Sequence, residues 1–343
     1  MPLLLGLLIF SFIISSLLLV PFIDLLYTLR FQRQKQKTID ALGKRTPIFD
    51  RLHKDKAGTP IGGGLLVIGI VSLLFAFIFP LIRFFGINIT NVYPLKPELN
   101  IIFFTFISFG LLGLYDDIKK FFNVPASQFF GLRLRHKLAI QIVLATTIAI
   151  LMYQNLNISF FYIPYFGVLE MGWLFVPLAA FIIVSFTNAV NITDGLDGLA
   201  SGLMMIALFA FWFLSAAILD TVLSVFLALW LGSLIAFLYF NIYPARVFLG
   251  DVGALAFGAM FAVVGLLVGK VTALLVIGAI FIVEIASSLI QLVSKKFRGK
   301  KVFSVSPFHL WLQLKGWHEA KIVMRFWLAG IMLALFGAWL AVI

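Results

Sequence analysis

Residues 173–219, WLFVPLAAFIIVSFTNAVNITDGLDGLASGLMMIALFAFWFLSAAIL, carry two long apolar runs on either side of a short polar segment. Each run, 173–190 and 201–219, approaches the roughly 20 apolar residues that an α-helix needs to cross the hydrocarbon core of a bilayer. The segment between them contains the acidic, glycine-rich stretch DGLDG (194–198). This pattern predicts two transmembrane helices joined by a tight acidic turn at the membrane surface.

The whole chain has the composition of an integral membrane protein. Of its 343 residues 62% are hydrophobic and 12% are charged, with a mean hydropathy of +1.11, whereas soluble domains carry about 25% charged residues. The chain has no cysteine, which excludes a disulfide framework and thiolate chemistry. The net charge of +12 does not indicate nucleic acid binding, because basic residues of membrane proteins collect beside anionic lipid headgroups on the cytoplasmic side. We therefore expect membrane lipids, and no nucleic acid, as partners.

Ten segments are apolar enough to span a membrane, which predicts an all-α polytopic fold with no inserted soluble domain. Weak polar breaks at Asp220 and at Gly269-Lys270 separate two close pairs of spans. The first run has no basic residues before it and no cleavage site after it, so we expect a retained helix. Residues 157–172, rich in aromatics, proline and glycine, predict a short hairpin at the outer interface. The predicted spans are 3–27, 60–82, 100–116, 138–156, 173–190, 201–219, 222–240, 252–269, 271–292 and 323–342.

The basic residues orient these spans. The loops 28–58, 119–137, 241–250 and 293–325 contain 23 of the 26 Lys and Arg residues, and all four lie on one side of a ten-span fold. The positive-inside rule places this side in the cytoplasm and both termini outside.

Five aspartates fall at the cytoplasmic ends of predicted spans. Asp116 and Asp117 end the third span, Asp194 and Asp197 follow the fifth, and Asp251 opens the eighth. A single aspartate beside a membrane helix is most often a solvated end or an N-cap. Five carboxylates from three separate loops repel one another, however, unless cations hold them together. Their shared location predicts a functional site at the cytoplasmic face.

The chemistry of such a site follows from its ligands. Carboxylates without cysteine suit Mg²⁺, which often bridges one or two carboxylates to the phosphates of a substrate. Neighbouring basic loops suit a polyanion, although a lysine at the cytoplasmic face often has no role beyond topology. The sequence therefore predicts Mg²⁺-dependent phosphoryl transfer at the cytoplasmic membrane face. The basic residues expected on that surface are Lys54, Lys56, Lys119, Lys120, Arg133, Arg135, Lys137, Lys315 and Lys321.

Six segments in the same order resemble the polyprenyl-phosphate N-acetylhexosamine-1-phosphate transferase superfamily, and within it the phospho-N-acetylmuramoyl-pentapeptide transferases. The resemblance runs over nearly the whole chain and implies one integral-membrane transferase domain, residues 1–343, in the bacterial cytoplasmic membrane. Its ten-span architecture with external termini agrees with the span count. The segments are KAGTPIGGG (56–64), GLYDDIKK (113–120), GLRLRHKLAIQ (131–141), NAVNITDGLDGLA (188–200), FNIYPARVFLGDVGALAFG (240–258) and SPFHLWLQLKGWHEAKIVMRFW (306–327).

The resemblance implies a reaction of peptidoglycan biosynthesis. Phospho-MurNAc-pentapeptide moves from UDP-MurNAc-pentapeptide to undecaprenyl phosphate, giving lipid I and UMP, with Mg²⁺ as cofactor. Asp251 and Asp117 match positions implied to bind the metal, and Asp116 and Asp117 match positions that handle the lipid phosphate. Whether one of them acts as a base stays open, because a phosphate monoester is already largely ionised at about pH 7. A homodimer is also implied, since dimers are known in the family.

The same resemblance implies a substrate-binding set. The nucleotide-facing loop would comprise Asn191, Asp194, Gly195 and Asp197. Four more residues belong to the implied substrate-binding set: Asn241 and Phe248 would border the nucleotide, and Lys56 and Lys137 would suit the phosphates. His309 matches the first histidine of the last motif and is implied to be catalytic.

The last motif departs from the family. Where three consecutive histidines are usual, this chain reads His309, Leu310 and Trp311. The loss of two imidazoles puts the sugar specificity or the activity level in question, and lineage drift without functional effect is the alternative explanation. Smaller departures are Gln313 for a usual glutamate, Ile61 for threonine and Ala254 for serine.

Two other functions compete with this one. A sister enzyme that transfers GlcNAc-1-phosphate to the same lipid shares the aspartate motifs, although LKGWHE (314–319) and the NITDGLDG segment favour the muramoyl-pentapeptide branch. A transporter predicts acidic residues near the bilayer centre, and only Glu284 meets that description. An inactive homologue is not supported, because all the motif aspartates are present.

Overall fold

The computed structural model describes residues 2–32, 47–84, 89–121, 132 and 134–343. The predicted Arg133, and much of the basic loops 28–58 and 119–137, lie outside the described residues. Nine helices in the described ranges are long and apolar enough to cross a membrane, and a bent helix pair brings the total to ten. The prediction of a mostly helical fold with about ten spans is confirmed.

The observed helices follow the predicted spans closely, with end shifts of a few residues. Asp220, the weak break between two predicted spans, is the N-cap of α8, and its side chain accepts a hydrogen bond of 3.0 Å from the backbone N–H of Leu223. The long helices are α1 (Pro2–Thr28), α3 (Gly63–Phe84), α4 (Leu95–Phe121), α5 (Leu134–Asn155), α6 (Phe175–Thr193), α7 (Leu199–Ala217), α8 (Thr221–Asn241), α9 (Gly250–Leu267) and α13 (Glu319–Val342).

The predicted span 271–292 is not one straight helix. It consists of α10 (Val271–Ile277) and α11 (Ala279–Phe297), which meet at an angle of 72°. The bend lies at Gly278, where a Cβ atom would lie 2.5 Å from the ring of Phe186 on α6. Glycine lets the chain come this close to α6, and the helix axis changes direction at the same residue. Hydropathy does not reveal such a bend, because both halves are apolar.

The short elements lie in the connections. Residues 47–56 form α2 (Pro47–Leu52) and the 3₁₀ turn η1 (Lys54–Lys56), and α12 (Phe308–Leu314) precedes α13. The hairpin predicted within 157–172 is present: β1 (Phe160–Ile163) pairs antiparallel with β2 (Gly167–Glu170), and the 3₁₀ turn η2 (Gly172–Leu174) follows.

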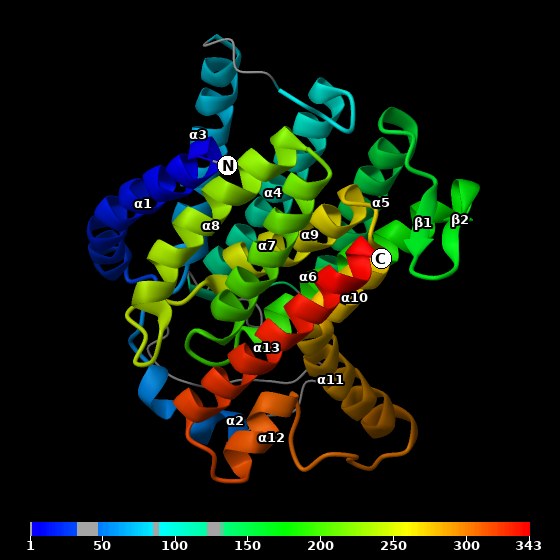
Figure 1. Ribbon diagram of the computed structural model, residues 1–343. Helices are drawn as coiled ribbons and strands as arrows, with labels where there is room; N and C mark the ends of the chain where they lie inside the picture. The colour runs from blue at the N-terminus through cyan, green and yellow to red at the C-terminus, as the bar shows by residue number, and fades with distance from the viewer. Residues whose placement is uncertain (1, 33–46, 85–88, 122–131, 133) are drawn as a thin grey trace.

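The centre of the bundle is formed by α8 and α9, whose side chains are almost all buried by protein. Helices α1, α3, α4, α6 and α7 pack around this pair, and α5 and α13 lie farther out (Figure 1). A helix that is apolar on every side suits a central place in a membrane protein, because neighbouring helices surround it.

Helices α4 and α9 pack unusually closely at one point. A Cβ atom at Gly113 on α4 would lie 2.2 Å from the backbone oxygen of Asp251 on α9. Small residues permit such close helix contacts in membranes. This contact places the first turn of α9 directly against the end of α4 that carries Asp116 and Asp117.

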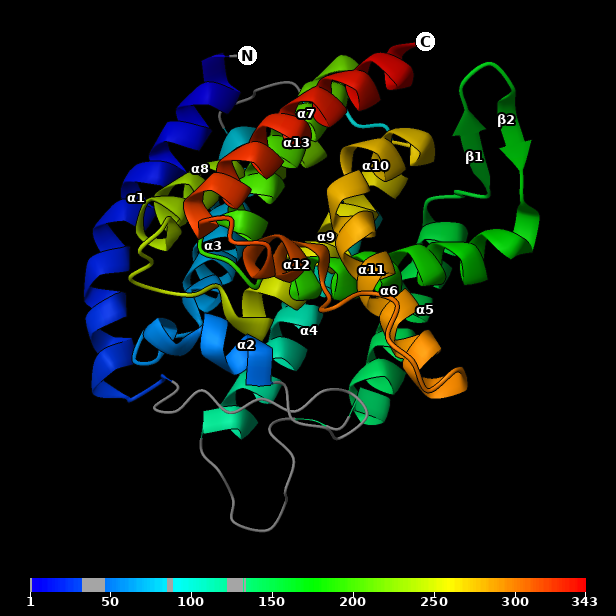
Figure 2. The same ribbon diagram turned by 90° about the horizontal axis from the view of Figure 1, so that it is seen from below.

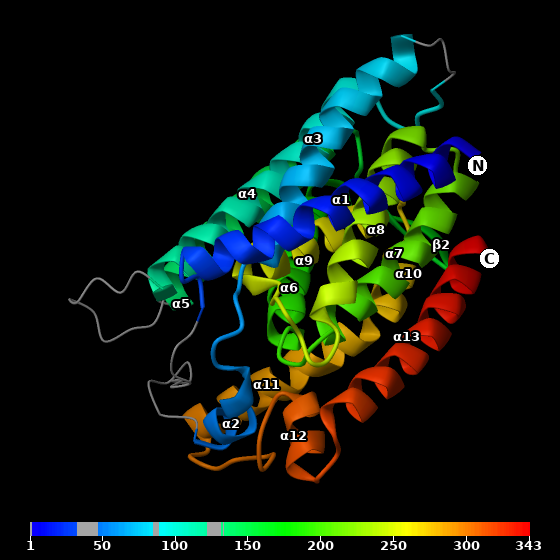
Figure 3. The same cartoon turned by 90° about the vertical axis from the view of Figure 1, so that its left-hand side faces the viewer.

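The two ends of the bundle differ in character. Both termini and the β1–β2 hairpin lie at one end, and α2 and α12 lie at the other (Figures 2 and 3). The last turns of α4, α6 and α8 and the first turn of α9 therefore point to the end that carries α2 and α12. The five aspartates predicted to share one face belong to this end.

Candidate active site

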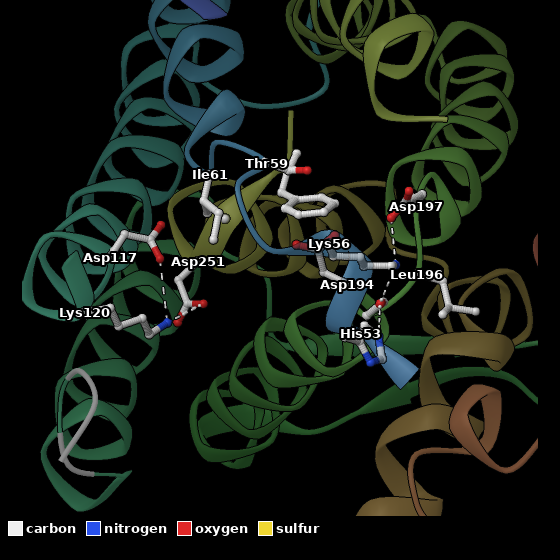
Figure 4. Close-up of a pocket in the computed structure, with 13 residues that line it drawn as sticks. His53, Lys56, Thr59, Ile61, Asp117, Lys120, Asp194, Leu196, Asp197 and Asp251 are labelled. Carbon is white, nitrogen blue, oxygen red and sulfur yellow. Dashed lines mark hydrogen bonds and ion pairs between the residues drawn. The ribbon is translucent and has the colours of Figure 1, made fainter. Parts of the chain in front are cut away.

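A pocket opens at this end, between η1, the end of α4, the α6–α7 turn and the start of α9. Asp117, Lys120 and Asp251 lie on one side of it, and Lys56, Asp194 and Asp197 lie on the other (Figure 4). The complete set of described lining residues is His53, Lys56, Thr59, Ile61, Asp117, Lys120, Asp194, Gly195, Leu196, Asp197, Phe248, Gly250 and Asp251.

The first side of the pocket is a cluster of carboxylates around an ammonium group. Lys120 Nζ lies 2.8 Å from Asp251 Oδ1 and 3.6 Å from Asp117 Oδ1. The other oxygen of Asp117, Oδ2, accepts a hydrogen bond of 3.0 Å from the backbone N–H of Val252 in the first turn of α9. Asp117 therefore has one carboxylate oxygen fixed by the backbone and one that faces Lys120.

Asp116 and Lys137 lie behind this cluster and are not among the described lining residues. Asp116 Oδ1 accepts from the backbone N–H of Leu132 at 2.6 Å, and its Oδ2 lies 3.0 Å from Lys137 Nζ and 3.2 Å from Lys120 Nζ. Lys137 also pairs directly with Asp251. Both residues are buried, and their ion pairs hold Lys120 and Asp251 in place.

The second side of the pocket is built around Lys56. Its ammonium lies 2.7 Å from Asp197 Oδ1 and 2.6 Å from Glu319 Oε1, and it donates to the carbonyl of Gly195 at 3.3 Å. Two carboxylates thus already neutralise Lys56, whereas the sequence predicted a phosphate contact. Its Nζ lies 5.9 Å from the centre of the Phe248 ring, within the range of a cation–π interaction.

Phe248 reaches the pocket because two loops pair there. Ile61 and Phe248 form an isolated parallel β-bridge, and Phe248 donates its backbone N–H to the carbonyl of Pro60 at 2.8 Å. The ring of Phe248 is partly exposed within the pocket. A flat aromatic face beside carboxylates suits a nucleobase, which stacks on one and hydrogen-bonds to the others.

Asp194 caps the end of α6 and contributes a carboxyl group with altered acidity. The pKa of Asp194 is raised to about 7, mainly because the carboxyl group is buried and also because the negative charge of Asp251 is near, while Lys56 acts in the opposite direction. The carboxylates on the two sides of the pocket therefore interact electrostatically, and one of them gains or loses a proton near neutral pH.

His309 lies at the back of the α6–α7 turn and is not among the described lining residues. A Cβ atom at Gly195 would lie 2.5 Å from His309 Nε2, so only glycine allows this contact. His309 Nδ1 donates to Glu284 Oε2 at 2.9 Å, and the backbone N–H of His309 donates to Glu284 Oε1 at 3.1 Å. Glu284 was the one acidic residue that fitted the transporter hypothesis. Both of its carboxylate oxygens accept hydrogen bonds from His309, so it holds α12 in place.

The two asparagines occupy different places. Asn241 is buried, donates to the carbonyl of Val247 at 2.9 Å and accepts from Ser201 Oγ at 2.5 Å. It therefore fixes the segment that carries Phe248 without itself lining the described pocket. Asn191 lies in the last turns of α6 and is partly exposed, also outside the described lining.

The residues that depart from the family pattern lie mostly away from the pocket. Leu310 is buried, and Trp311 stacks on Phe308 with ring centres 5.7 Å apart. Ala254 is buried on α9. His309 lies against Gly195 in the α6–α7 turn, and Ile61 is the one small departure among the described residues that line the pocket.

A divalent cation fits the first side of the pocket. Asp117 Oδ1 and Asp251 converge on the Lys120 ammonium, which shows that a positive charge is favourable at their shared focus. No group of three or more His, Cys, Asp or Glu side chains among the described residues is arranged to hold a metal ion. Two carboxylates are nevertheless enough for Mg²⁺, which usually completes its shell with water and substrate phosphates.

The sequence left several pocket residues unassigned. Lys120 was expected on the cytoplasmic surface but without a specific role, although its spacing of i+3 and i+4 from Asp117 and Asp116 places all three on one helix face. His53 and Thr59 line the pocket, and Glu319 lies behind it. No local signal links Glu319 to Lys56, because 263 residues separate them.

Comparison with known proteins identifies the relatives of this chain. Residues 99–269 match the sequence model of glycosyl transferase family 4. The chain is 34% identical to the phospho-N-acetylmuramoyl-pentapeptide-transferase of Bacillus pumilus over 341 residues, covering 97% of this chain and 96% of that protein. The protein of the same name from Acetivibrio thermocellus is 34% identical over 96% of this chain and 94% of its own length. That from Staphylococcus aureus is 36% identical over 84% of this chain and 87% of its own.

Proposed function

We propose that this chain, which belongs to glycosyl transferase family 4 and within it to the phospho-N-acetylmuramoyl-pentapeptide transferases, transfers phospho-MurNAc-pentapeptide from UDP-MurNAc-pentapeptide to undecaprenyl phosphate. The products are UMP and the lipid-linked pyrophosphate, lipid I. The chain is a multi-pass phosphotransferase of peptidoglycan synthesis in the bacterial cytoplasmic membrane. We extend the transferase domain to the whole chain, residues 1–343.

One observation carries the assignment of the site. A single pocket joins an aromatic and acidic side, suited to a nucleoside, to a side with two carboxylates and a lysine, suited to a metal and phosphates. Both sides lie at the end of the bundle that the basic loops place in the cytoplasm. A sugar nucleotide made in the cytoplasm and a lipid phosphate held in the membrane can meet only at such a boundary.

The nucleotide lies across the pocket in this proposal. Its uracil ring stacks on Phe248, and Asp194 and Asp197 offer acceptors to the base and ribose. The pyrophosphate then reaches the opposite side, where the Lys120 ammonium already faces carboxylates. Lys56 acts at the nucleoside end, because its charge is paired with Asp197 and Glu319.

Asp251 and Asp117 would hold Mg²⁺, since these two carboxylates line the pocket and converge on one cation. The bound metal would supply charge neutralisation for the pyrophosphate and align the reacting groups. Asp116 does not line the described pocket, so we assign it to the positioning of Lys120 and Lys137 rather than to contact with the lipid phosphate.

The chemical step needs little from the protein beyond alignment. An oxygen of undecaprenyl phosphate forms a bond to the sugar-linked phosphorus, and the bond from that phosphorus to the UMP oxygen breaks. The nucleophile is already ionised, so no base is required. Lys120 would neutralise the charge that develops on the departing UMP, and Asp251 would keep the lysine in place.

The test is UMP release by the detergent-purified full chain with undecaprenyl phosphate and Mg²⁺, comparing UDP-MurNAc-pentapeptide with UDP-GlcNAc. Turnover of the muramoyl substrate, abolished by EDTA, is the expected result. Turnover of UDP-GlcNAc alone would contradict the proposal and assign the sister reaction. The mass of the purified protein in detergent would check the homodimer, which stays a prediction.

A further inference from the structure

The carboxylate of Glu319 joins three parts of the chain that are far apart in sequence. Its Oε1 lies 2.6 Å from Lys56 Nζ in η1 and accepts a hydrogen bond of 2.6 Å from the backbone N–H of Asp197. Lys56 and Asp197 form an ion pair of their own, so the three residues form a closed triangle. Glu319 is only 8% exposed and is not among the described residues that line the pocket.

The location of Glu319 is set by its helix rather than by the pocket. It is the first residue of α13, and His318 before it caps that helix by accepting a hydrogen bond from the backbone N–H of Ala320. Backbone N–H groups at a helix N-terminus favour a carboxylate there. The carboxylate of Glu319 is thus fixed next to the ammonium of Lys56, whose side chain would otherwise adopt many rotamers.

The triangle also fixes the backbone of the α6–α7 turn. The Asp197 backbone N–H is held by Glu319, while Asp197 Oδ2 accepts from the backbone N–H of Ala245 at 2.9 Å. This second bond ties the turn to the segment that carries Phe248. Displacement of Glu319 would therefore shift both an acidic residue and the lysine that face the nucleoside side of the pocket.

We propose that Glu319 is a positioning residue for the sugar nucleotide, acting through Lys56 and Asp197 without touching the substrate. The proposal rests on the proposed function, in that the side of the pocket with Phe248, Lys56 and Asp197 receives the uridine. It assigns Glu319 to nucleotide affinity and leaves the lipid phosphate side, with Asp251 and Lys120, unaffected.

Substitutions at Glu319 separate its two contacts. Glu319→Gln keeps an oxygen that can accept from Asp197 N–H but loses the charge that faces Lys56, and Glu319→Ala loses both. We expect Glu319→Gln to raise the KM for the UDP-sugar by roughly tenfold, the scale of one lost charge-assisted hydrogen bond, and Glu319→Ala to raise it further. Glu319→Asp should recover part of the affinity. The KM for undecaprenyl phosphate and the Tm should stay close to wild type.

Two controls sharpen the test. Glu170→Gln removes the same charge from the exposed strand β2 and should leave every parameter unchanged. In a Lys56→Met background Glu319→Gln should raise the KM for the UDP-sugar much less, because the effects of two substitutions that remove the same contact are not additive. Equilibrium binding of UMP by each variant gives the same comparison without turnover.

The outcomes are distinct. Weaker UMP binding with unchanged Tm supports the proposal. A fall in Tm and in the active fraction with unchanged KM, or wild-type kinetics in Glu319→Ala, would overturn it. Failure of the wild-type chain to bind UMP or to turn over any UDP-sugar would refute the proposed function itself, so the two failures are distinguishable.

Discussion

At the scale of single residues, this site consists of carboxylates whose charges are compensated by particular lysines. Asp251 pairs with Lys120 and Lys137, and Asp197 pairs with Lys56. A buried carboxylate without such a partner loses the hydration that stabilises its charge. The charges of Asp251 and Asp197 therefore depend on the placement of lysines from other elements.

Asp251→Asn should lower turnover by roughly 100-fold or more, the scale of removing a group that stabilises transition-state charge. A neutral amide holds Mg²⁺ poorly and weakens the pairing with Lys120 and Lys137. The measurement is kcat for UMP release, with UMP binding and Tm as checks that the fold is intact. Asp24→Asn on the exposed face of α1 removes the same charge and should behave as wild type; normal turnover in Asp251→Asn would remove that residue from the site.

Asp194 should make the metal-free protein less stable as the pH rises. Its pKa is about 7 in the native state against 3.8 as the ordinary value. As the pH rises, the carboxyl group loses its proton at a lower pH in the unfolded state than in the native state. The free energy of unfolding therefore falls between about pH 4 and pH 7. In EDTA, Asp194→Asn should show a higher Tm than wild type at pH 8 and a smaller decrease from pH 5 to pH 8. Identical pH profiles of Tm in the two proteins would contradict the raised pKa.

At the scale of elements, the site depends on how closely helices approach one another. The ends of α4 and α9 meet where Gly113 lies against the backbone of Asp251. The bend between α10 and α11 directs α11 away from the bundle axis, and Glu284 on α11 then holds His309 against the α6–α7 turn. A straight ninth span would not have placed these groups together.

Gly113→Ala should impair both stability and activity. The added methyl group would lie 2.2 Å from the backbone oxygen of Asp251, and such overpacking typically costs about 1–3 kcal/mol. The displaced turn of α9 carries Asp251, so kcat should fall along with Tm. Gly69→Ala on α3 is the matched control, because a Cβ atom there has no neighbour within 4 Å; equal effects of the two substitutions would exclude the close contact as the cause.

At the scale of the whole molecule, the arrangement separates two chemical environments. Apolar helices surround α8 and α9, and the charged pocket lies at a single end of the bundle. The termini and the β1–β2 hairpin lie at the other end (Figures 2 and 3). The positive-inside rule assigns the pocket end to the cytoplasm.

This orientation can be measured directly, because the natural chain has no cysteine. A single cysteine at Tyr165, which is 77% exposed in the hairpin, should react with a membrane-impermeant maleimide on intact spheroplasts. A cysteine at the exposed Lys296, near the end of α11, should react only after permeabilisation. The reverse pattern would invert the topology and contradict the cytoplasmic site.

The amino-acid sequence was enough to predict the membrane class, the ten apolar segments, the clustering of basic loops and the family. Hydropathy and charge act over whole segments, so they can be read without knowledge of contacts. The motif aspartates Asp117, Asp194, Asp197 and Asp251 were also predicted, and the structure brings them together in one pocket.

The separate roles of these residues follow from their contacts in the fold. The fold placed Asp116, Lys137, Asn241 and His309 behind the pocket, paired Lys56 with carboxylates and brought in Glu319 from α13. The close contact of Gly278 with Phe186 of α6, at the bend, is likewise visible only in the fold. Such features arise from distances between side chains that are far apart along the chain, and no local pattern of residue types encodes those distances.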